Sequence, residues 1–406
     1  MSQFYDLASL VVIPSGYKAS TIYAQKPLTT DGQLSFSRAS TATRVNASGL
    51  IEAVASNVPR LDYLGSSCPR LLLEPQRTNV VTYSEQINNA AWGKLNTTIS
   101  ANAAVAPDGT TSADLVYPTT TGTDRVIEQL PVGIIGQTWT SSFFVKASGF
   151  SWVLIYSPNL VTCWFNASTG TFGTVGAGVT ATVLGQVNGF WRVSFTGTIA
   201  SSNAYLYVGT ADANGTTTST ASGTNGILIW GCQIELGAYA TSYIPTLAAS
   251  VTRVADAASK TGISSLIGQT EGVLFVDYNY EAKPDSSGNI PIVVYTGSSE
   301  AYIYITNAGA LRFELYNAGS LQALISGTIG AAGRKKIAFA YKQNDFVAYM
   351  NGVQIGTDTS GTVGAMASVN IGCYYTSNYS TVSGMNQALL FKTRLTNAQM
   401  QELTTL

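Results

Sequence analysis

The sequence predicts an all-β protein: an irregular N-terminal β region, two β-sandwiches and a short C-terminal helix. Only 11% of its 406 residues are charged, whereas soluble domains usually contain about 25%. Ser, Thr, Asn and 39 Gly take the place of the missing charges, and these residues suit solvated sheet faces and tight turns. Short apolar segments separated by such residues recur along the chain, which is typical of sandwiches and barrels.

The first region spans residues 1–80 and differs from the rest of the chain. Residues 34–45 are predicted to form a strand, residues 46–49 a turn and residues 50–54 a returning strand. Residues 71–73 form a further short buried strand. Such a short, irregular region cannot bury a good core alone, so we expect it to pack on a neighbour or to oligomerise.

The second region, residues 81–250, is predicted to be a jelly-roll sandwich. Its apolar segments are bounded by turn-forming residues, as in sandwich strands. The clearest predicted strands are residues 139–147, 152–156, 163–165, 190–195, 204–208 and 226–230.

The third region, residues 251–406, is predicted to be a concanavalin-like sandwich. The connection at residues 246–268 has weak helical periodicity, and strands resume near Glu271. Asn351-Gly352 predicts a two-residue hairpin turn, because both positions of that turn need a positive φ. Thr396 as N-cap, with Gln399 three residues later, predicts a C-terminal helix.

The composition excludes several classes of function. A formal net charge of -1 provides no basic excess for phosphates or anionic lipid, so neither nucleic-acid partners nor membrane insertion are expected. The N-terminus lacks a Lys/Arg-rich start and carries Asp6, so it is a poor signal peptide. No apolar run approaches the roughly 20 residues that span a bilayer. We therefore expect a soluble protein made in a cytoplasm.

The sequence contains no histidine. This removes Ser-His-Asp and Cys-His catalysis, His-ligated zinc and the commonest general base. Carboxylate pairs, Lys or Tyr chemistry and oxygen-ligated Ca²⁺ or Mg²⁺ remain. We expect no cofactor.

The cysteines and the acidic loops predict neither a metal site nor a redox site. Cys68, Cys163, Cys232 and Cys373 show no C-x-x-C spacing and are interpreted as small buried hydrophobes; Cys163 with Cys232 is the pair to test as a disulfide. Residues 212–215 and 285–289 offer oxygen ligands for Ca²⁺ but lack the EF-hand spacing, so they are interpreted as turns.

Three stretches resemble known families. Phe36-Ser-Arg-Ala-Ser-Thr-Ala-Thr-Arg-Val with residues 58–63 and 71–79 resembles the N-terminal region of phage head-fibre and tail-associated proteins, among them the head fibres of crAss-like phages. That resemblance implies that residues 1–80 attach the protein to phage capsid or tail proteins as part of a homotrimer. The candidate residues for attachment and oligomerisation are Arg38, Arg44, Arg60 and Arg77.

The other two stretches lie in the predicted sandwiches. Gln233-Ile-Glu-Leu-Gly237, with Gly189-Phe-Trp-Arg-Val, resembles jelly-roll carbohydrate-binding modules. Residues 333–353 and 388–400 resemble concanavalin-like, laminin-G-type sandwiches, which implies binding of glycans or proteins. Carbohydrate binding does not follow from such a fold alone.

Exposed aromatic residues would bind a sugar, because pyranose C–H groups stack on Trp and Tyr rings while Asn, Asp and Gln bond the hydroxyls. The alternative is that these aromatics belong to the core, and we assign Trp191 and Trp230 to it. Trp139, Trp152 and Tyr205 are further aromatic candidates. The candidate residues for binding a glycan or host surface are Trp92, Trp164, Tyr374, Tyr375, Asn378 and Tyr379.

The sequence favours a non-enzymatic, structural virion protein, a homotrimeric head fibre that displays binding sandwiches toward bacterial surface glycans. A tail or tail-fibre receptor-binding protein and a decoration protein without a ligand are alternatives of the same class. A capsule-degrading glycoside hydrolase is the alternative enzyme. It would need a carboxylate pair such as Asp124 with Glu128, or Glu235 with another acid.

Overall fold

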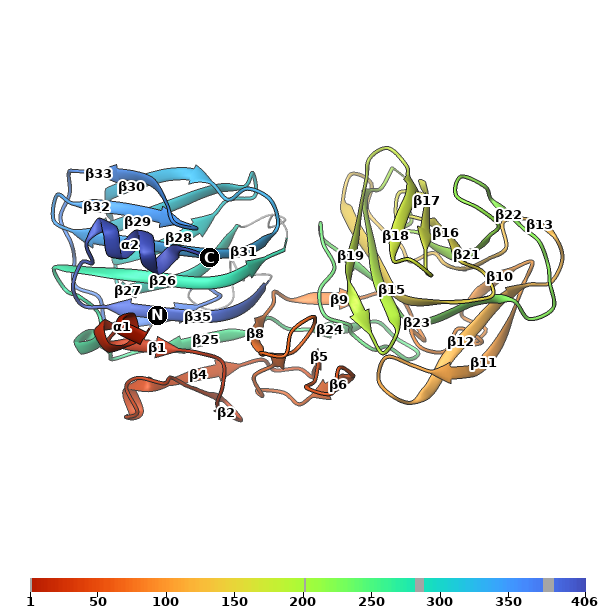
Figure 1. Cartoon of the computed structure of the whole chain (residues 1–406), viewed down its shortest axis with the longest axis horizontal. Helices are drawn as coiled ribbons and strands as arrows, with labels where there is room; N and C mark the ends of the chain where they lie inside the picture. Colours follow the sequence, from red (N-terminus) through yellow and green to blue (C-terminus); the bar gives the residue numbers. More distant parts are fainter. Residues whose placement is uncertain (1, 201, 282–287, 375–382) are drawn as a thin grey trace.

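The computed structural model describes residues 2–200, 202–281, 288–374 and 383–406, and this part of the chain confirms the predicted all-β class. Two sandwiches lie side by side (Figure 1). One, here called the terminal sandwich, contains both chain ends, and the other, the insert sandwich, is formed by residues 80–246.

The first sheet of the terminal sandwich, the β26 sheet, has eight strands, and β1 pairs with its strand β35 outside the main strand path. In spatial order the strands are β33 (Val353–Asp358), β32 (Phe346–Met350), β31 (Gly333–Lys342), β26 (Glu271–Tyr280), β35 (Ser383–Phe391), β8 (Arg70–Leu73) and β7 (Leu61–Asp62), with β1 (Leu10–Val12) beside β35.

The second sheet of the terminal sandwich, the β28 sheet, has nine strands. Its apolar side chains face those of the β26 sheet and form one core, to which Leu34, Leu274 and Phe313 belong. In spatial order the strands are β2 (Tyr17–Lys18), β3 (Thr21–Tyr23), β4 (Gln33–Ser37), β25 (Ala257–Lys260), β34 (Ser368–Ile371), β27 (Asn289–Thr296), β28 (Ser299–Ile305), β29 (Ala310–Asn317) and β30 (Ser320–Thr328).

Helices α1 (Ser2–Leu7) and α2 (Asn397–Thr404) contribute side chains to a second apolar cluster, with residues of the β26 sheet. Phe4, Met400 and Leu403 pack there against Val273 and Phe275, whose side chains point out of the sandwich core. Thr396 caps α2 with the predicted capping box. The predicted C-terminal helix is therefore confirmed. Single-turn 3-10 helices occupy Thr30–Gly32 and Ser264–Leu266.

The insert sandwich has two six-stranded sheets, here called the β16 sheet and the β15 sheet. The β16 sheet has the order β10 (Gly93–Leu95), β14 (Val126–Gln129), β21 (Leu206–Ala211), β16 (Trp152–Tyr156), β17 (Thr162–Asn166) and β18 (Thr171–Val175). The β15 sheet has the order β11 (Thr97–Val105), β12 (Thr111–Pro118), β23 (Gly226–Leu236), β15 (Thr138–Ser148), β20 (Phe190–Thr198) and β19 (Val179–Val187).

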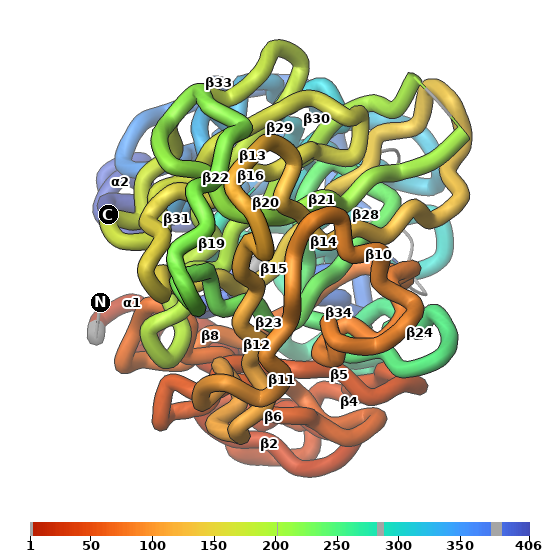
Figure 2. The backbone as a smooth tube through the Cα atoms, turned by 90° about the vertical axis from the view of Figure 1, so that its right-hand side faces the viewer, coloured from red at the N-terminus to blue at the C-terminus, as the bar shows by residue number. Residues whose placement is uncertain are grey.

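The outer face of the β15 sheet is covered by the hairpin of β5 (Ala42–Val45) and β6 (Ile51–Val54). Val45 and Ile51 of this hairpin pack in one cluster with Phe144 and Trp230 of the sheet. Figure 2 shows the N-terminal segment below the insert sandwich, where this hairpin lies. The predicted hairpin is confirmed over residues 42–54, with its turn at residues 46–49. The predicted first strand, residues 34–45, divides into β4 and β5, because β4 pairs with β3 and β25 of the terminal sandwich instead.

Residues 1–80 do not fold apart from the terminal sandwich but complete both of its sheets. Strands β1 and β8 pair with β35, and β4 pairs with β25. Because the region is too short to bury its own core, its apolar strands join the nearest sheet edges. The insert sandwich therefore interrupts the terminal sandwich, and the chain enters and leaves it through the paired strands β9 (Arg77–Asn79) and β24 (Val251–Arg253).

A turn in the terminal sandwich, the connection between the sandwiches and a small separate sheet are the remaining local features of the fold. Asn351 and Gly352 have φ of 49° and 79° between β32 and β33, which confirms the predicted hairpin. The connection at residues 246–268 holds β24, β25 and one 3-10 turn instead of an α-helix, because pairing with β9, β4 and β34 overrides its weak periodicity. A separate two-stranded sheet of β13 (Gly122–Thr123) and β22 (Thr218–Ser219) lies at one end of the insert sandwich.

No helix in the described part of the chain is long and apolar enough to span a membrane.

Candidate functional site

The outer face of the β16 sheet carries a group of partly exposed aromatic side chains. Along β16 the side chains alternate, so that Val153 and Ile155 enter the sandwich core while Trp152 and Tyr156 face outward. The neighbouring strand β21 places Tyr207 directly opposite Tyr156. Alternation and register therefore gather tyrosines from two strands on one face.

Three tyrosines and two carboxylates on this face form what we call the tyrosine face: Tyr156, Tyr205, Tyr207, Asp124 and Glu128. The rings of Tyr205 and Tyr207 stack with centroids 5.9 Å apart and planes 18° apart. Tyr156 meets Tyr207 edge-on at 5.5 Å. All five residues are partly exposed, so the rings present apolar surface to solvent.

The carboxylates of the tyrosine face accept hydrogen bonds from its hydroxyls. Tyr156 Oη donates to Asp124 Oδ1 at 2.6 Å, and Tyr207 donates to Glu128, the residue opposite it on β14. Partial burial and these carboxylates raise the pKa of Tyr207 to about 12 and that of Tyr156 above its usual value. Both hydroxyls therefore remain protonated donors, and each carboxylate keeps further lone pairs for a ligand.

Gly209 lies on β21, two positions after Tyr207. It is opposite Leu154 on one side and Val126 on the other. A Cβ atom at Gly209 would lie 1.9 Å from the carbonyl oxygen of Arg125, so the close approach of β14 requires glycine here.

The structure corrects the prediction that Trp92 and Trp164 contact a ligand. Trp92 is 2% exposed in the core of the insert sandwich, and its Nε1 donates to the Tyr83 carbonyl at 3.0 Å. Trp164 is 8% exposed, and its Nε1 donates to the Thr216 carbonyl at 2.7 Å. Both indoles are therefore buried. The prediction relied on the polar residues beside them in the sequence, and these do not determine whether a side chain is exposed in the fold.

Of the predicted C-terminal contact residues, Tyr374 is described, whereas Tyr375, Asn378 and Tyr379 lie outside the described residues. Tyr374 is half-buried, and its hydroxyl donates to both carboxylate oxygens of Glu300, at 3.1 and 2.9 Å. Its ring meets Tyr302 of β28 edge-on, with centroids 6.1 Å apart. A ligand-binding role for this loop stays a prediction.

Arg38 and Arg60, predicted at an attachment surface, lie instead inside the molecule, at 1% and 0% exposure. Arg38 Nη1 is 3.0 Å from Asp256 Oδ1, and Arg60 Nη2 also pairs with Asp256. Arg60 Nη1 is 2.8 Å from Glu74 Oε2. These side chains have no surface left for a virion protein, which corrects that part of the prediction.

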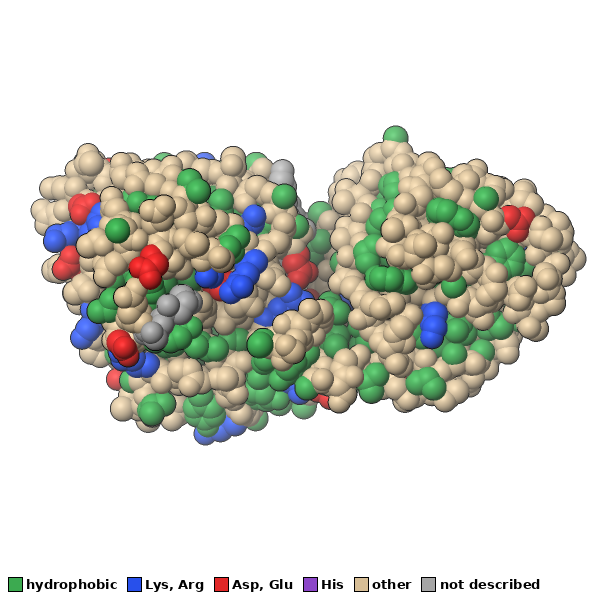
Figure 3. Space-filling model, viewed as in Figure 1, with side chains coloured by type: hydrophobic (Ala, Val, Ile, Leu, Met, Phe, Trp, Pro, Cys, Tyr) green, Lys and Arg blue, Asp and Glu red, His purple; other side chains and the backbone are tan. Residues whose placement is uncertain are grey.

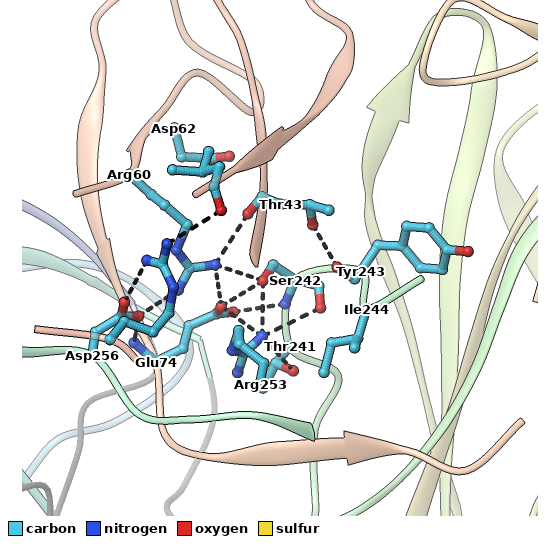
Figure 4. Close-up of polar contacts among 12 residues, drawn as sticks. Thr43, Arg60, Asp62, Glu74, Thr241, Ser242, Tyr243, Ile244, Arg253 and Asp256 are labelled. Atoms are coloured by element: carbon cyan, nitrogen blue, oxygen red, sulfur yellow. Dashed lines mark hydrogen bonds and ion pairs between the residues drawn. The ribbon is translucent and has the colours of Figure 1, made fainter. Parts of the chain in front are cut away.

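The ion pairs of Arg60 belong to a buried network between the sandwiches (Figure 4). Glu74 Oε2 is 2.9 Å from Arg253 Nη1, and Glu74 accepts the backbone N–H and the hydroxyl of Ser242 at 2.7 and 2.6 Å. Glu74 belongs to the N-terminal region and Ser242 to the end of the insert sandwich. The network therefore ties the two sandwiches together through charge-assisted bonds.

The remaining two arginines also have partners within the chain. Arg44 Nε is 2.6 Å from Glu52 Oε1 across the β5–β6 hairpin. The guanidinium of Arg77 lies 4.9 Å from the ring centroid of Tyr239. Participation of Arg44 and Arg77 in virion attachment stays a prediction.

The buried network predicts that the contribution of Glu74 to the stability of the fold depends on pH. Two arginines and the hydrogen bonds of Ser242 hold the pKa of Glu74 far below its usual value, against the opposing effect of burial. A carboxyl with a depressed folded-state pKa stabilises the fold above its unfolded pKa, and this contribution is lost as the pH falls. We expect the difference in unfolding free energy between the wild type and Glu74→Gln to shrink between neutral pH and about pH 3. Urea titrations at several pH values measure the unfolding free energy of both proteins. A difference between them that does not change with pH would contradict this prediction.

The alternatives of catalysis and metal binding find little support at the candidate residues. Glu235 is buried and accepts bonds from Gln233 and Thr241, which makes it a structural residue. Within the described residues, no group of three or more Cys, Asp or Glu is arranged to hold a metal ion. Cys163 and Cys232, which the sequence offered as a possible disulfide, are buried free thiols in the structure. Asp285 lies outside the described residues.

A cleft of about 1120 Å³ lies between the two sandwiches, and Figure 3 shows the molecule hollowed there. Its walls carry Thr180, Thr182 and Ser194 from the insert sandwich and Arg334 from the terminal one. Arg334 is committed to Asp277 through two hydrogen bonds of 2.9 and 2.6 Å. The stacked rings of Tyr205 and Tyr207 make the tyrosine face the stronger candidate for a sugar.

Sequence reasoning missed two members of the tyrosine face, Tyr156 and Tyr207. Asp124 and Glu128 were named as a possible carboxylate pair for hydrolysis, and between them the guanidinium of Arg125 donates to the carbonyls of residues 120, 121 and 123. The two-residue spacing of Tyr205 and Tyr207 was the available signal, because such residues share one face of a strand.

Comparison with known proteins gives partial structural likenesses. The sequence matches no family model and no curated protein. The carbohydrate-binding module CBM40 of a Ruminococcus gnavus sialidase, bound to α2,3-sialyllactose, has a TM-score of 0.31 and 16% identity, over 36% of this chain and 91% of that one. NanB sialidase of Streptococcus pneumoniae has 0.30 and 15%, over 36% of this chain and 26% of that one.

Domain 4 of AbnA, an arabinanase of Geobacillus stearothermophilus, in complex with arabinotriose, has a TM-score of 0.29 and 14% identity. It covers 42% of this chain and 81% of that one. This chain spans about a quarter of the NanB chain. At such TM-scores these likenesses assign no ligand to this protein.

Proposed function

We propose that this chain is a bacteriophage virion protein, a homotrimeric head fibre that binds host-surface glycans through its tyrosine face without cleaving them. The observation that carries the binding role is the stacked pair of Tyr205 and Tyr207 on an outward sheet face, flanked by Asp124 and Glu128. These two nearly parallel rings present aromatic surface on which the C–H face of a pyranose can pack. The carboxylates accept hydrogen bonds from sugar hydroxyls.

The arrangement favours binding over hydrolysis. Glycoside hydrolysis needs one carboxyl that donates a proton to the leaving oxygen and a second that acts as base or nucleophile. Asp124 and Glu128 each accept a hydrogen bond from a tyrosine that keeps its proton, so both serve as acceptors. We expect purified host polysaccharide to keep its chain length in the presence of the protein. Shortening of the polysaccharide would favour the hydrolase instead.

The virion role rests on the resemblance of residues 1–80 to phage head-fibre proteins. A trimer would present three tyrosine faces, and several weak sites on one particle increase affinity without new contacts. A tail or tail-fibre location and pure decoration are the alternatives. Immunogold labelling of particles separates head from tail, and sedimentation of the purified chain measures its oligomeric state. A protein absent from particles, or a stable monomer, would contradict this part of the proposal.

The binding role predicts a large effect of one tyrosine. Tyr207→Ala removes the ring that contacts both Tyr205 and Tyr156, so we expect a loss of about 2 kcal/mol, or about thirtyfold, in glycan affinity. A glycan array identifies the ligand, and calorimetric titration measures the affinity. Tyr117→Ala, on β12 of the other sheet, is the matched control and should bind as the wild type does. Equal affinities of Tyr207→Ala and wild type would refute the assignment.

A further inference from the structure

The insert sandwich contains few positive charges, and each has a defined place. Between residues 81 and 246 the cationic side chains are Lys94, Arg125, Lys146 and Arg192. Figure 3 shows few charged side chains on the visible face of this sandwich. Where these four cations point decides whether the tyrosine face can bind an anionic ligand.

Two of the four cations lie near the β16 sheet, and both donate to backbone carbonyls. Lys94 pairs with Ile127, a core residue, so both side chains lie on the core side of the sheet, opposite the tyrosine face. Lys94 Nζ donates to the carbonyls of Asn89 and Trp92 at 2.7 and 3.0 Å. Arg125 is 8% exposed and donates to backbone carbonyls of the adjoining turn.

The other two cations belong to the β15 sheet. The ammonium of Lys146 lies 5.7 Å from the ring centroid of Phe190. Arg192 is 8% exposed and donates to the Thr241 carbonyl at 2.7 Å. All four cationic side chains of the insert sandwich, which are all described, are therefore engaged with backbone carbonyls or an aromatic ring.

The tyrosine face itself presents negative potential. Asp124 and Glu128 supply two carboxylates, and the π faces of the tyrosine rings are the negative ends of their quadrupoles. A cation is attracted both by the carboxylates and by the rings, whereas an anion meets repulsion from both. The partial exposure of these residues leaves the interaction open to screening by salt.

From this charge arrangement we propose that the tyrosine face selects sugars that carry a free amine, accepts the same sugars when the amine is acetylated, and rejects sugars that carry a carboxylate. This proposal rests on the proposed glycan-binding function and names its ligand class. A pyranose stacked on Tyr205 and Tyr207 would place an amine substituent toward Asp124 or Glu128. A carboxylate at the same position would find no cation to neutralise it.

The test uses matched ligands on the sugar backbone that the glycan array identifies: one with a free amine, one N-acetylated and one with a carboxylate. We expect the full-length protein to bind the amine form about fivefold or more tightly than the N-acetylated form. Binding of the carboxylate form should be undetectable. The amine preference should decrease as the salt concentration rises.

Variants that remove a negative charge but keep the size of the side chain show whether charge or shape determines the preference for the amine. Asp124→Asn and Glu128→Gln keep an acceptor for the tyrosine hydroxyls, so we expect the ratio of the amine to the N-acetyl affinity to fall about fivefold in each. Asp108→Asn removes a charge in the turn between β11 and β12, where Asp108 bonds Thr110, and should leave that ratio unchanged. Circular dichroism verifies that each variant is folded.

The outcomes are distinguishable from failure of the proposed function. Binding of the N-acetylated ligand with an unaltered ratio in both charge variants would overturn the charge selectivity while leaving glycan binding intact. Binding of the carboxylate form as tightly as the N-acetylated form would overturn it as well. Binding of no glycan would overturn the proposed function and the selectivity together.

Discussion

Deleting residues 1–80 is expected to leave the terminal sandwich unable to fold. The deletion removes β1 and β8, which pair with β35, and β4, which pairs with β25. Eight large buried side chains leave the core with them, at roughly 1.5–3 kcal/mol each. The sum, about 12–24 kcal/mol, is as large as or larger than the roughly 5–15 kcal/mol that stabilises a whole domain. These side chains are Leu10, Val12, Ile22, Leu34, Phe36, Leu61, Leu71 and Leu73.

Expression of residues 81–406, followed by thermal unfolding and circular dichroism, measures this effect. We expect insoluble protein or a chain without a cooperative transition. Co-expression of residues 1–80 as a separate fragment should restore a soluble complex, which serves as the control. A monomeric 81–406 fragment with a native-like transition would show that the first region is an independent module.

Replacing Arg60 with Met is expected to lower the free energy of unfolding by about 3–5 kcal/mol. The substitution leaves Glu74 and Asp256, at 3% and 0% exposure, without the cation that pairs with both of them. Glu74 keeps Arg253 and Asp256 keeps Arg38, but each buried carboxylate loses one of its two cations, and burial makes that loss costly. Urea unfolding, followed by tryptophan fluorescence, measures the loss.

Lys342→Met provides the contrast for Arg60. Its ammonium lies 3.3 Å from Glu271, but the two side chains are 53% and 29% exposed. Exposed pairs contribute about 0–1 kcal/mol, so this variant should unfold almost as the wild type does. Equal losses in both variants would indicate that the buried network has no special role in joining the sandwiches.

Much of the fold could be predicted because its signals are local. Asn351-Gly352 determines a turn through its own backbone preferences, and Thr396 with Gln399 begins a helix through two reciprocal bonds. Alternating apolar residues in segments such as residues 33–37 indicate strands with one buried face. Such features depend on neighbours within a few residues, which a single sequence displays.

The roles of the arginines could not be predicted because they depend on distant residues. Arg38 meets Asp256 across 218 positions of sequence, and Arg60 meets Asp256 across 196. A charged residue in a polar segment usually lies at the surface, so the sequence favoured exposure. Only the pairing of N-terminal strands with β25 and β35 brings these charges together and buries them.

Of the three tyrosines of the candidate site, the sequence analysis named Tyr205 but neither Tyr156 nor Tyr207. Aromatic rings beside polar side chains were expected, yet Trp92 entered the core and Tyr207 joined Tyr156 on an outward face. That face depends on which strand lies beside β16, and β21 follows it by 50 residues. Strand order and register, which decide exposure, are not local properties.

The most direct test of the account is the structure of the protein bound to the glycan that an array identifies. The account predicts a sugar ring packed on Tyr205 and Tyr207, with its polar substituents within hydrogen-bond distance of Asp124 or Glu128. A sugar bound in the cleft between the sandwiches, or beside Tyr302 and Tyr374, with the tyrosine face empty, would contradict it.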